Sequence, residues 1–472
     1  MLKIADDRYA PMARCISGAV AAASLSIAVW ILFREAPLYS SSSDIGWHWL
    51  LAAHYGSRPV GGPHAAEVLD VMGTYPPLAH LLAAQGRLIF GSELRAMSVL
   101  ASLAVLSVYI FCFWGLIRFS GLVLAGVFLI ANLAAARWRS AIGHEIIDNY
   151  FFPQLIATAA ALFALWGVTS IKNTRHAFAA AWFATAALTF IFPATAIVFA
   201  AAYGMRDLLG RKPSLSHLAM VGLRASLLIL AILANPYFWP MIRNAQYEGA
   251  NTVMLSSSVI AIIALAVTAT SFAGGRALMR RPAGLQAVGF LAAGYALTAL
   301  TQFAAAQFGF GGVYAISKYA FGLCTFSIAL IVILVPLRPR HIATPIALAA
   351  AVLATLSMIG VELRPYQSFD LSQIEEIDGA ATTLASAAPN HRFLNDTAVR
   401  LPALPAGLNF AIAKVSLQSR WAVSYDTLHI NGALEQRSPA PARYLLVPSN
   451  DVGNCVFAQS AELAFIRREC AD

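Results

Sequence analysis

Two short polar segments of this apolar chain carry carboxylates at spacings that favour acid–base chemistry. In the first segment, residues 43–48, Asp44 and His48 are four residues apart, so on a helix they share a face. In the second, residues 143–154, a helix would place His144, Glu145 and Asp148 on one side. A carboxylate beside aromatic residues and a histidine at a membrane edge suits an enzyme that acts on a lipid-borne substrate. The carboxylate would be the general base that takes a proton from an acceptor hydroxyl.

Each of these groups also has a plainer interpretation. An Asp just past an apolar run can cap a helix, and acids at a helix start are stabilised by the helix dipole. Both histidines can be interfacial residues satisfied by hydrogen bonds, and no spacing matches a zinc signature. We predict catalytic roles for Asp44, Glu145 and Asp148. Asp44 and Asp148 are also candidate ligands for a divalent cation, Mg²⁺ or Mn²⁺.

Cations and aromatic residues on the same side of the predicted bundle are the candidates for substrate binding. Arg243 and Lys318 stand near the ends of apolar runs, where a cation either extends to the interface or holds a phosphate group. Aromatic residues at these positions form interfacial belts by default and can also stack on a sugar ring. The residues predicted to bind substrate are His48, Tyr75, His144, Trp239, Arg243 and Lys318.

The elements that must position these residues are membrane spans. Of the 472 residues, 59% are hydrophobic and 12% are charged, which is typical of a polytopic membrane protein. A span needs about 20 apolar residues. We predict about eleven, with a tight helical pair or one broken helix at Phe192-Pro193; the runs are 14–34, 97–117, 119–136, 152–171, 176–191, 193–206, 218–236, 257–274, 284–304, 319–337 and 341–361.

The charge distribution predicts the orientation of the chain. Lys and Arg gather in alternate loops, which places the N-terminus in the cytoplasm and the C-terminal region outside. The net charge is +9, but no basic tract with interleaved aromatics occurs, so nucleic-acid binding is not expected. The predicted cytoplasmic segments contain only three acids, Asp6, Asp7 and Asp207, so the acidic chemistry belongs to the outer face.

Two regions outside the spans are large enough to be structured. The first outward loop, 35–96, is predicted to hold interfacial helices, with an amphipathic one over 47–55 and another after Tyr75. We predict a transmembrane module over residues 1–361 and a small extracytoplasmic α+β domain over residues 362–472. The second domain should contain a strand over 443–448. Cys112 and Cys324 are predicted packing residues, and Cys455 and Cys470 can form a disulfide outside the cytoplasm.

This order of features resembles the GT-C superfamily of integral-membrane glycosyltransferases. The resemblance covers about residues 14–340. It rests on the first span with its Asp44 loop, the segment 74–78 (Thr-Tyr-Pro-Pro-Leu), the paired runs 179–192 and 193–205, and the acids before the fourth span. It implies a polyprenyl-phosphate-linked sugar donor and a glycan, lipid or protein acceptor at the outer face of a bacterial inner membrane.

The same resemblance implies roles for individual residues. The first-loop acid maps to Asp44, the second-loop acid to Glu145 or Asp148, and the phosphate-binding cation to Lys318 or Arg243. Transfer would invert the configuration at the anomeric carbon of the sugar. Other classes stay open: a glycan or lipid transporter, an assembly factor without chemistry, or a glycan polymerase or ligase. A transporter should show inverted repeats and helices broken at midplane, and only Phe192-Pro193 hints at a break.

Overall fold

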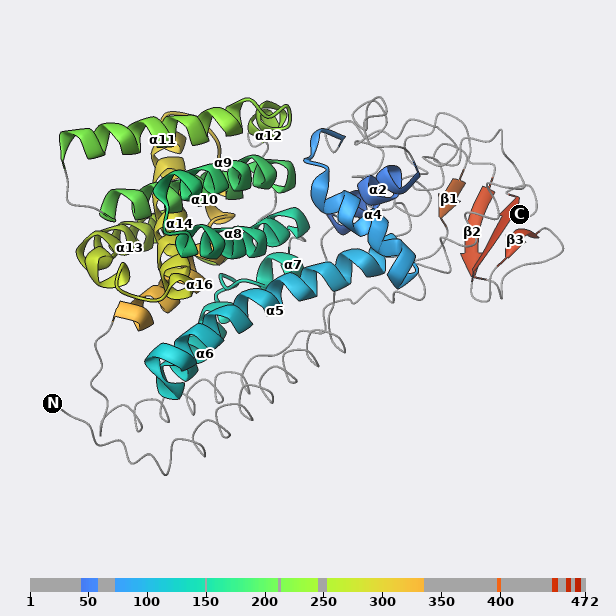
Figure 1. The fold of residues 1–472 in the computed structure, drawn as a ribbon. Helices are drawn as coiled ribbons and strands as arrows, with labels where there is room; N and C mark the ends of the chain where they lie inside the picture. The colour runs from blue at the N-terminus through green and yellow to red at the C-terminus, as the bar shows by residue number, and fades with distance from the viewer. Residues whose placement is uncertain are drawn as a thin grey trace. The chain divides into compact units, whose positions relative to one another are not determined.

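The computed structural model describes residues 44–57, 73–148, 151–210, 214–244, 253–334, 397–399, 444–448, 456–459 and 463–467. Figure 1 shows the helices and strands of these ranges. The chain divides into two compact units, each described here by itself. The first comprises 1–36, 101–146 and 153–364, and the second comprises 37–100, 147–152 and 365–472.

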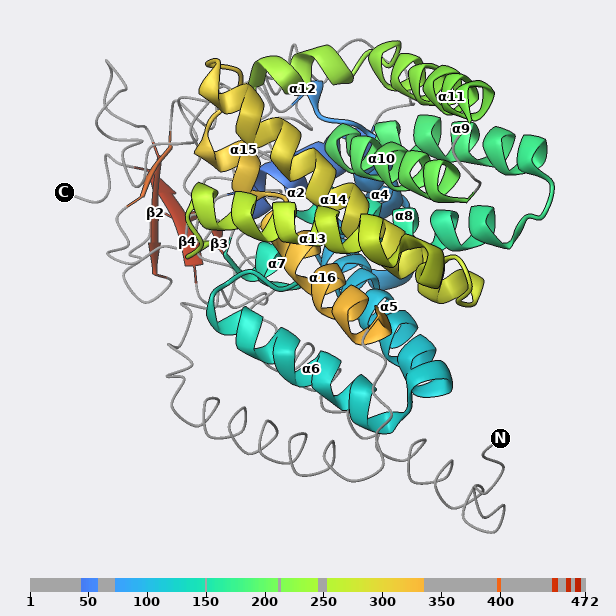
Figure 2. The same cartoon turned by 90° about the vertical axis from the view of Figure 1, so that its left-hand side faces the viewer.

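The described helices of the first unit form a packed bundle. They are the greater part of α5 (Glu93–Ser120), α6 (Leu122–Arg137), most of α7 (His144–Asp148), α8 (Phe152–Ser170), α9 (Thr174–Ile191), α10 (Pro193–Leu209), α11 (Leu215–Leu233), α12 (Phe238–Asn244), α13 (Ser257–Leu278), α14 (Ala283–Gln307), α15 (Val313–Ser317) and α16 (Ala320–Leu334). Figure 2 shows α14 among α10, α13 and α16, the three helices that it packs against most extensively.

Six stretches of described helix are long and apolar enough to cross a membrane: 93–119, 152–170, 215–233, 257–278, 283–307 and 314–334. They confirm six of the predicted spans. Three further predicted spans form α6, α9 and α10, helices of 16, 18 and 17 residues that fall short of the length or apolarity of a full crossing. The predicted spans 14–34 and 341–361 lie outside the described residues.

The expected break at Phe192-Pro193 is a junction between two helices. Phe192 is extended, with φ −161° and ψ 108°, and separates α9 from α10. Pro193 occupies the first position of α10, where a missing N–H costs no intrahelical hydrogen bond. The backbone N–H of Phe192 still bonds to the Leu188 carbonyl oxygen. The two alternatives for this segment therefore resolve in favour of a tight helical pair.

Helix α14 lies at the centre of the first unit and is buried along most of its length. Small residues allow this close approach, as in other membrane bundles. A Cβ at Gly294 would collide with the Val198 carbonyl oxygen of α10 and lie 2.9 Å from the Ala202 Cβ. The backbones of α10 and α14 therefore meet at Gly294 with no room for a side chain.

The variant Gly294→Ala should lower the free energy of unfolding by about 1–3 kcal/mol, because α10 and α14 must move apart. Thermal unfolding of the purified chain in detergent measures this loss. Gly167→Ala is the matched control, since a Cβ at Gly167 meets no other atom within 4 Å. Equal melting temperatures for both variants would contradict this account of the α10–α14 contact.

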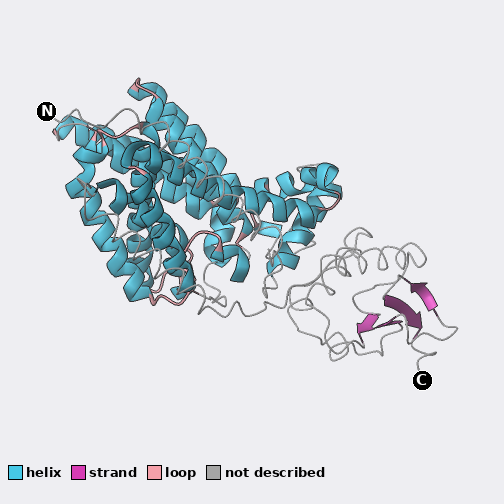
Figure 3. Ribbon diagram, turned by 90° about the horizontal axis from the view of Figure 1, so that it is seen from below, coloured by secondary structure: helices cyan, strands magenta, loops and turns pink. Residues whose placement is uncertain are grey.

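The second unit contains α2 (Asp44–Ser57), α4 (Leu78–Phe90), the first turns of α5 and a small sheet. The strands are β1 (Thr397–Val399), β2 (Tyr444–Pro448), β3 (Val456–Gln459) and β4 (Leu463–Arg467), in the order β1-β2-β4-β3. Among these described strands, β1 and β2 pair in parallel, and the other two pairings are antiparallel. Figure 3 colours these strands magenta. Strand β2 confirms the strand predicted at 443–448.

The prediction of an amphipathic surface helix over 47–55 is wrong. Residues 48–54 of α2 are all buried, the polar His48 and His54 included, at 3% and 6% exposed. A helix that is buried on every side belongs to the interior of a protein unit. Helix α4 packs directly against α2. It begins after Pro77, so the helix start predicted after Tyr75-Pro76-Pro77 is confirmed.

Candidate functional site

The best-defined acidic group is Glu145, in the first turn of the short helix α7. The segment before α7 is tied to two long helices of the first unit. Tyr109 of α5 donates a hydrogen bond to the Ile142 carbonyl oxygen at 3.0 Å. The Ile142 N–H donates to the Thr325 hydroxyl of α16, also at 3.0 Å. These two hydrogen bonds fix the backbone segment that precedes Glu145.

Glu145 is a buried carboxyl group, with 1% of its surface exposed. Its Oε2 accepts a hydrogen bond from the Gly143 N–H at 2.7 Å, and Gly143 reaches this conformation with a φ of +109° that favours glycine. Burial raises the pKa of Glu145 to about 7, against the lowering effect of the backbone N–H groups that bond to it. A carboxyl with this pKa exchanges a proton near neutral pH, as a general acid or base must.

A line of hydrogen bonds within the same unit runs from Tyr295 to the backbone of Lys318. Tyr295 lies close enough to interact electrostatically with Glu145, and its hydroxyl is 2.7 Å from that of Thr158. Thr158 bonds in turn to the Gln154 carbonyl oxygen, and the Gln154 Nε2 donates to the Lys318 carbonyl oxygen at 2.6 Å. Helices α8 and α14 thereby connect the surroundings of Glu145 to the end of α15.

The Tyr295 ring fits against α16 because this helix carries a glycine, Gly322, opposite the ring. A Cβ at Gly322 would collide with the Tyr295 ring. The ring also stacks on Phe326, at a centroid distance of 5.8 Å and an interplanar angle of 21°. The position of the Tyr295 hydroxyl, and with it the bond to Thr158, therefore depends on this packing.

The predicted cations have different surroundings. The Lys318 Nζ lies 4.3 Å from the centroid of the Tyr314 ring, one helical turn earlier, which is a cation–π contact. Arg243 is exposed near the end of α12. Trp239 lies on the same short helix, 54% exposed, and its indole N–H donates to the Leu233 carbonyl oxygen at 3.1 Å. Lys318 is thus the predicted cation whose backbone carbonyl ends the line of hydrogen bonds that begins at Tyr295.

A second cluster, within the second unit, contains two of the other predicted residues. His48 of α2 stacks on His80 of α4 at a centroid distance of 5.1 Å, with 2.8 Å between the His48 Nδ1 and the His80 Nε2. Tyr75 lies edge-on to His48 at 5.6 Å. Phe152 packs at 6.3 Å from His48 and 6.0 Å from His80. The structure therefore brings His48 and Tyr75 together around a histidine that the sequence analysis did not single out.

The hydrogen bonds assign the protons of the pair. The His80 Nδ1 is 3.2 Å from the Pro76 carbonyl oxygen, which can only accept, so this nitrogen carries a proton. Burial lowers the pKa of His80 to about 4, so the ring is neutral at pH 7 and its Nε2 accepts from the His48 Nδ1. The two hydrogen bonds therefore place a proton on the His48 Nδ1 and on the His80 Nδ1.

For two of the predicted acids, Asp44 and Asp148, the structure describes the backbone and not the side chain. Asp44 is the first residue of α2, one turn before His48, and Asp148 is the last residue of α7. Their side chains lie outside the described part of the structure, as do the predicted Cys455 and Cys470. His144 opens α7, as expected, and is partly exposed. Metal ligation by Asp44 and Asp148 stays a prediction; the described residues contain no group of three His, Cys, Asp or Glu arranged for a metal.

The sequence analysis missed His80 because only the tertiary structure brings this residue next to His48. In the sequence it is one histidine in an apolar helix, 32 residues from its partner. The Tyr75-Pro76-Pro77 start of α4 was recognised, and it places the Pro76 carbonyl one turn before His80. Nothing in the spacing of the two histidines indicates that α2 and α4 pack so closely.

The six candidate spans and their packing define an integral membrane protein built from α-helices, with a buried carboxyl at Glu145. No family model matches the chain, and no curated protein matches it. Among solved structures, the chain is similar to the crystal structure of ArnT from Cupriavidus metallidurans bound to undecaprenyl phosphate. The identity is 13%, the match covers 93% of this chain and 96% of that chain, and the TM-score is 0.45.

Proposed function

We propose that this chain is a glycosyltransferase of the bacterial plasma membrane. It moves a sugar from a polyprenyl-phosphate-linked donor to a glycan, lipid or protein acceptor outside the cytoplasm. The observation that carries the proposal is Glu145, a buried carboxyl whose pKa lies near 7, in the unit that also carries the Lys318 cation. Both belong to segments that the Lys and Arg distribution assigns to the outer face.

The chemistry needs one base and one cation. The base removes the proton of the acceptor hydroxyl as its oxygen attacks the anomeric carbon of the donor sugar. The bond from that carbon to the phosphate oxygen breaks, and polyprenyl phosphate leaves with the bonding electrons. A nearby ammonium group stabilises the charge on the departing phosphate. Little acid catalysis is required, since phosphate is already a good leaving group, and a single displacement inverts the anomeric centre.

Four of the predicted residues have a named role in this proposal. Asp44 and Glu145 are the candidate bases, and Lys318 is the candidate partner of the phosphate. His48, with its tautomer set by His80, is the candidate to orient the carboxylate of Asp44, because both positions share a face of α2. The proposal leaves the donor sugar open.

The test is transfer of a labelled sugar from polyprenyl-phosphate donors, in membranes that contain the native chain or Asp44→Asn at matched expression. The native chain should transfer label, and Asp44→Asn should transfer less. Asp207→Asn is the control, because Asp207 is a buried carboxylate paired with Arg224 at 2.7 Å on the predicted cytoplasmic side. Its transfer per folded protein should equal that of the native chain.

Two outcomes would change the assignment. Undiminished transfer by Asp44→Asn would remove Asp44 from the chemistry and leave Glu145 or Asp148 as the base. No transfer by the native chain across a panel of donors would contradict the glycosyltransferase proposal. A flux assay for lipid-linked glycans would then be the next experiment, because a transporter is the alternative that the sequence leaves open.

A further inference from the structure

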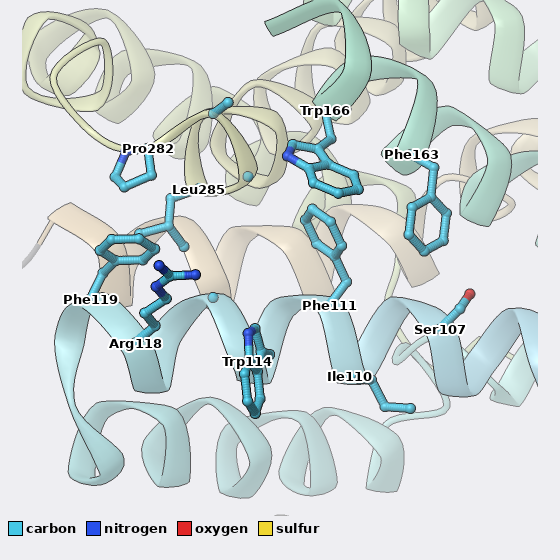
Figure 4. Close-up of a pocket in the computed structure, with 13 residues that line it drawn as sticks. Ser107, Ile110, Phe111, Trp114, Arg118, Phe119, Phe163, Trp166, Pro282 and Leu285 are labelled. Carbon is cyan, nitrogen blue, oxygen red and sulfur yellow. The ribbon is translucent and has the colours of Figure 1, made fainter. Parts of the chain in front are cut away.

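The first unit contains a groove whose lining includes none of the predicted site residues. Figure 4 shows it between α5, the second half of α8 and the start of α14. Its volume is about 600 Å³, within the size range of small-molecule sites. Five of the thirteen residues that line it are aromatic: Phe111, Trp114, Phe119, Phe163 and Trp166. These residues make the groove an apolar and aromatic surface.

The groove has the length of half a bilayer. Along α5 it runs from Ser107 to Phe119. At 1.5 Å per residue this distance is about 18 Å, slightly more than half of the ~30 Å hydrocarbon core. Its walls are open to the exterior of the described bundle, since Trp114 is 62% exposed. An acyl chain of one leaflet would therefore fit along it.

One end of the groove carries a positive charge. Arg118 lies in the last turn of α5, exposed, with its guanidinium 5.6 Å from the centroid of the Phe119 ring. Figure 4 shows Arg118 beside Leu285, at the same end as Pro282. No acidic residue is among the described residues that line the groove. The α5–α6 and α13–α14 turns at this end are cytoplasmic by the Lys and Arg distribution.

We propose that this groove binds one anionic phospholipid of the cytoplasmic leaflet, with its phosphate against Arg118 and one acyl chain along α5 between Trp114 and Trp166. The charge of Arg118 selects the head group, and the aromatic walls hold the chain. The site is independent of the proposed sugar transfer, which takes place at the outer face. A cation near an anionic head group contributes enough attraction for about a fivefold preference.

Tryptophan fluorescence tests this proposal directly, because Trp114 and Trp166 are both in the groove. The full chain is purified in detergent and titrated with phosphatidylglycerol or phosphatidylcholine that carries brominated acyl chains, which quench nearby indoles. The double variant Trp114→Phe/Trp166→Phe isolates the signal of these two residues. Half-maximal quenching should need about fivefold less phosphatidylglycerol than phosphatidylcholine.

The variants separate head-group recognition from general contact with lipid. Arg118→Gln should abolish the preference, and Arg175→Gln should keep it, because Arg175 is an exposed arginine at the start of α9 outside the groove. Equal quenching by both lipids in the native chain, or a preference retained by Arg118→Gln, would overturn the proposal. Absence of quenching would also overturn it, because it would mean that a segment of the chain covers the groove. The proposal would fail as well if polyprenyl phosphate displaced the bound lipid at a lower concentration than phosphatidylglycerol requires.

Discussion

Replacing Glu145 with Gln should lower sugar transfer by about 100- to 10,000-fold, the usual contribution of a general base. The amide of Gln is close in size to the carboxyl and its oxygen can still accept from the Gly143 N–H, which now bonds to Glu145 Oε2 at 2.7 Å. The buried site should therefore keep its shape and lose only its ability to accept a proton. Initial rates at matched amounts of folded protein measure the loss.

The pH profile distinguishes a base from a residue that merely supports the fold. The carboxylate is the active form of a base, and the pKa of Glu145 is about 7. For the native chain, kcat/KM should therefore rise with pH up to about 7 and then level off. The residual activity of Glu145→Gln should show no such rise. A variant that keeps the native profile would contradict the role of Glu145 as the base.

The same variant should be more stable than the native chain at pH 8. The pKa of Glu145 is about 7 in the folded chain, against an ordinary value of 4.5, so the folded state binds this proton more tightly than the unfolded state. The stability that this proton contributes is complete below about pH 4.5 and is lost as the pH rises through 7. At 1.36 kcal/mol per pKa unit the loss is about 3 kcal/mol. Gln carries no such penalty.

Thermal unfolding in detergent at pH 5 and pH 8 measures this effect. The melting temperature of Glu145→Gln should exceed that of the native chain at pH 8, and the gap should narrow at pH 5. Asp207→Asn provides the opposite case, because it breaks the buried pair with Arg224 and should lose stability at pH 8. A Glu145→Gln variant less stable than the native chain at pH 8 would mean that the buried carboxyl is part of the framework.

Most of the helices could be predicted from the sequence because the signal is local. Apolar runs of adequate length gave six spans, and Pro193 marked the start of α10. The short helix with Glu145 followed from its spacing of acids and His144. Each of these inferences needs only neighbouring residues, since hydrogen bonds within a helix join residues four apart.

The errors and omissions come from packing between distant segments. The aromatic stretch of α2 looked amphipathic, yet residues 48–54 are buried on every side, which depends on α4 and the rest of the second unit. The His48–His80 pair joins residues 32 positions apart. The pKa of Glu145 follows from burial by several helices of the first unit, and no spacing in its own segment predicts it.

The contact between Tyr295 and Gly322 has a consequence for how this chain can diverge. The aromatic ring occupies the space that any side chain at 322 would need. A related protein that acquires alanine at this position must therefore shrink or reorient the residue at position 295, and then loses the hydroxyl partner of Thr158. The two positions should change together among descendants of a common ancestor, as a correlated pair in an alignment.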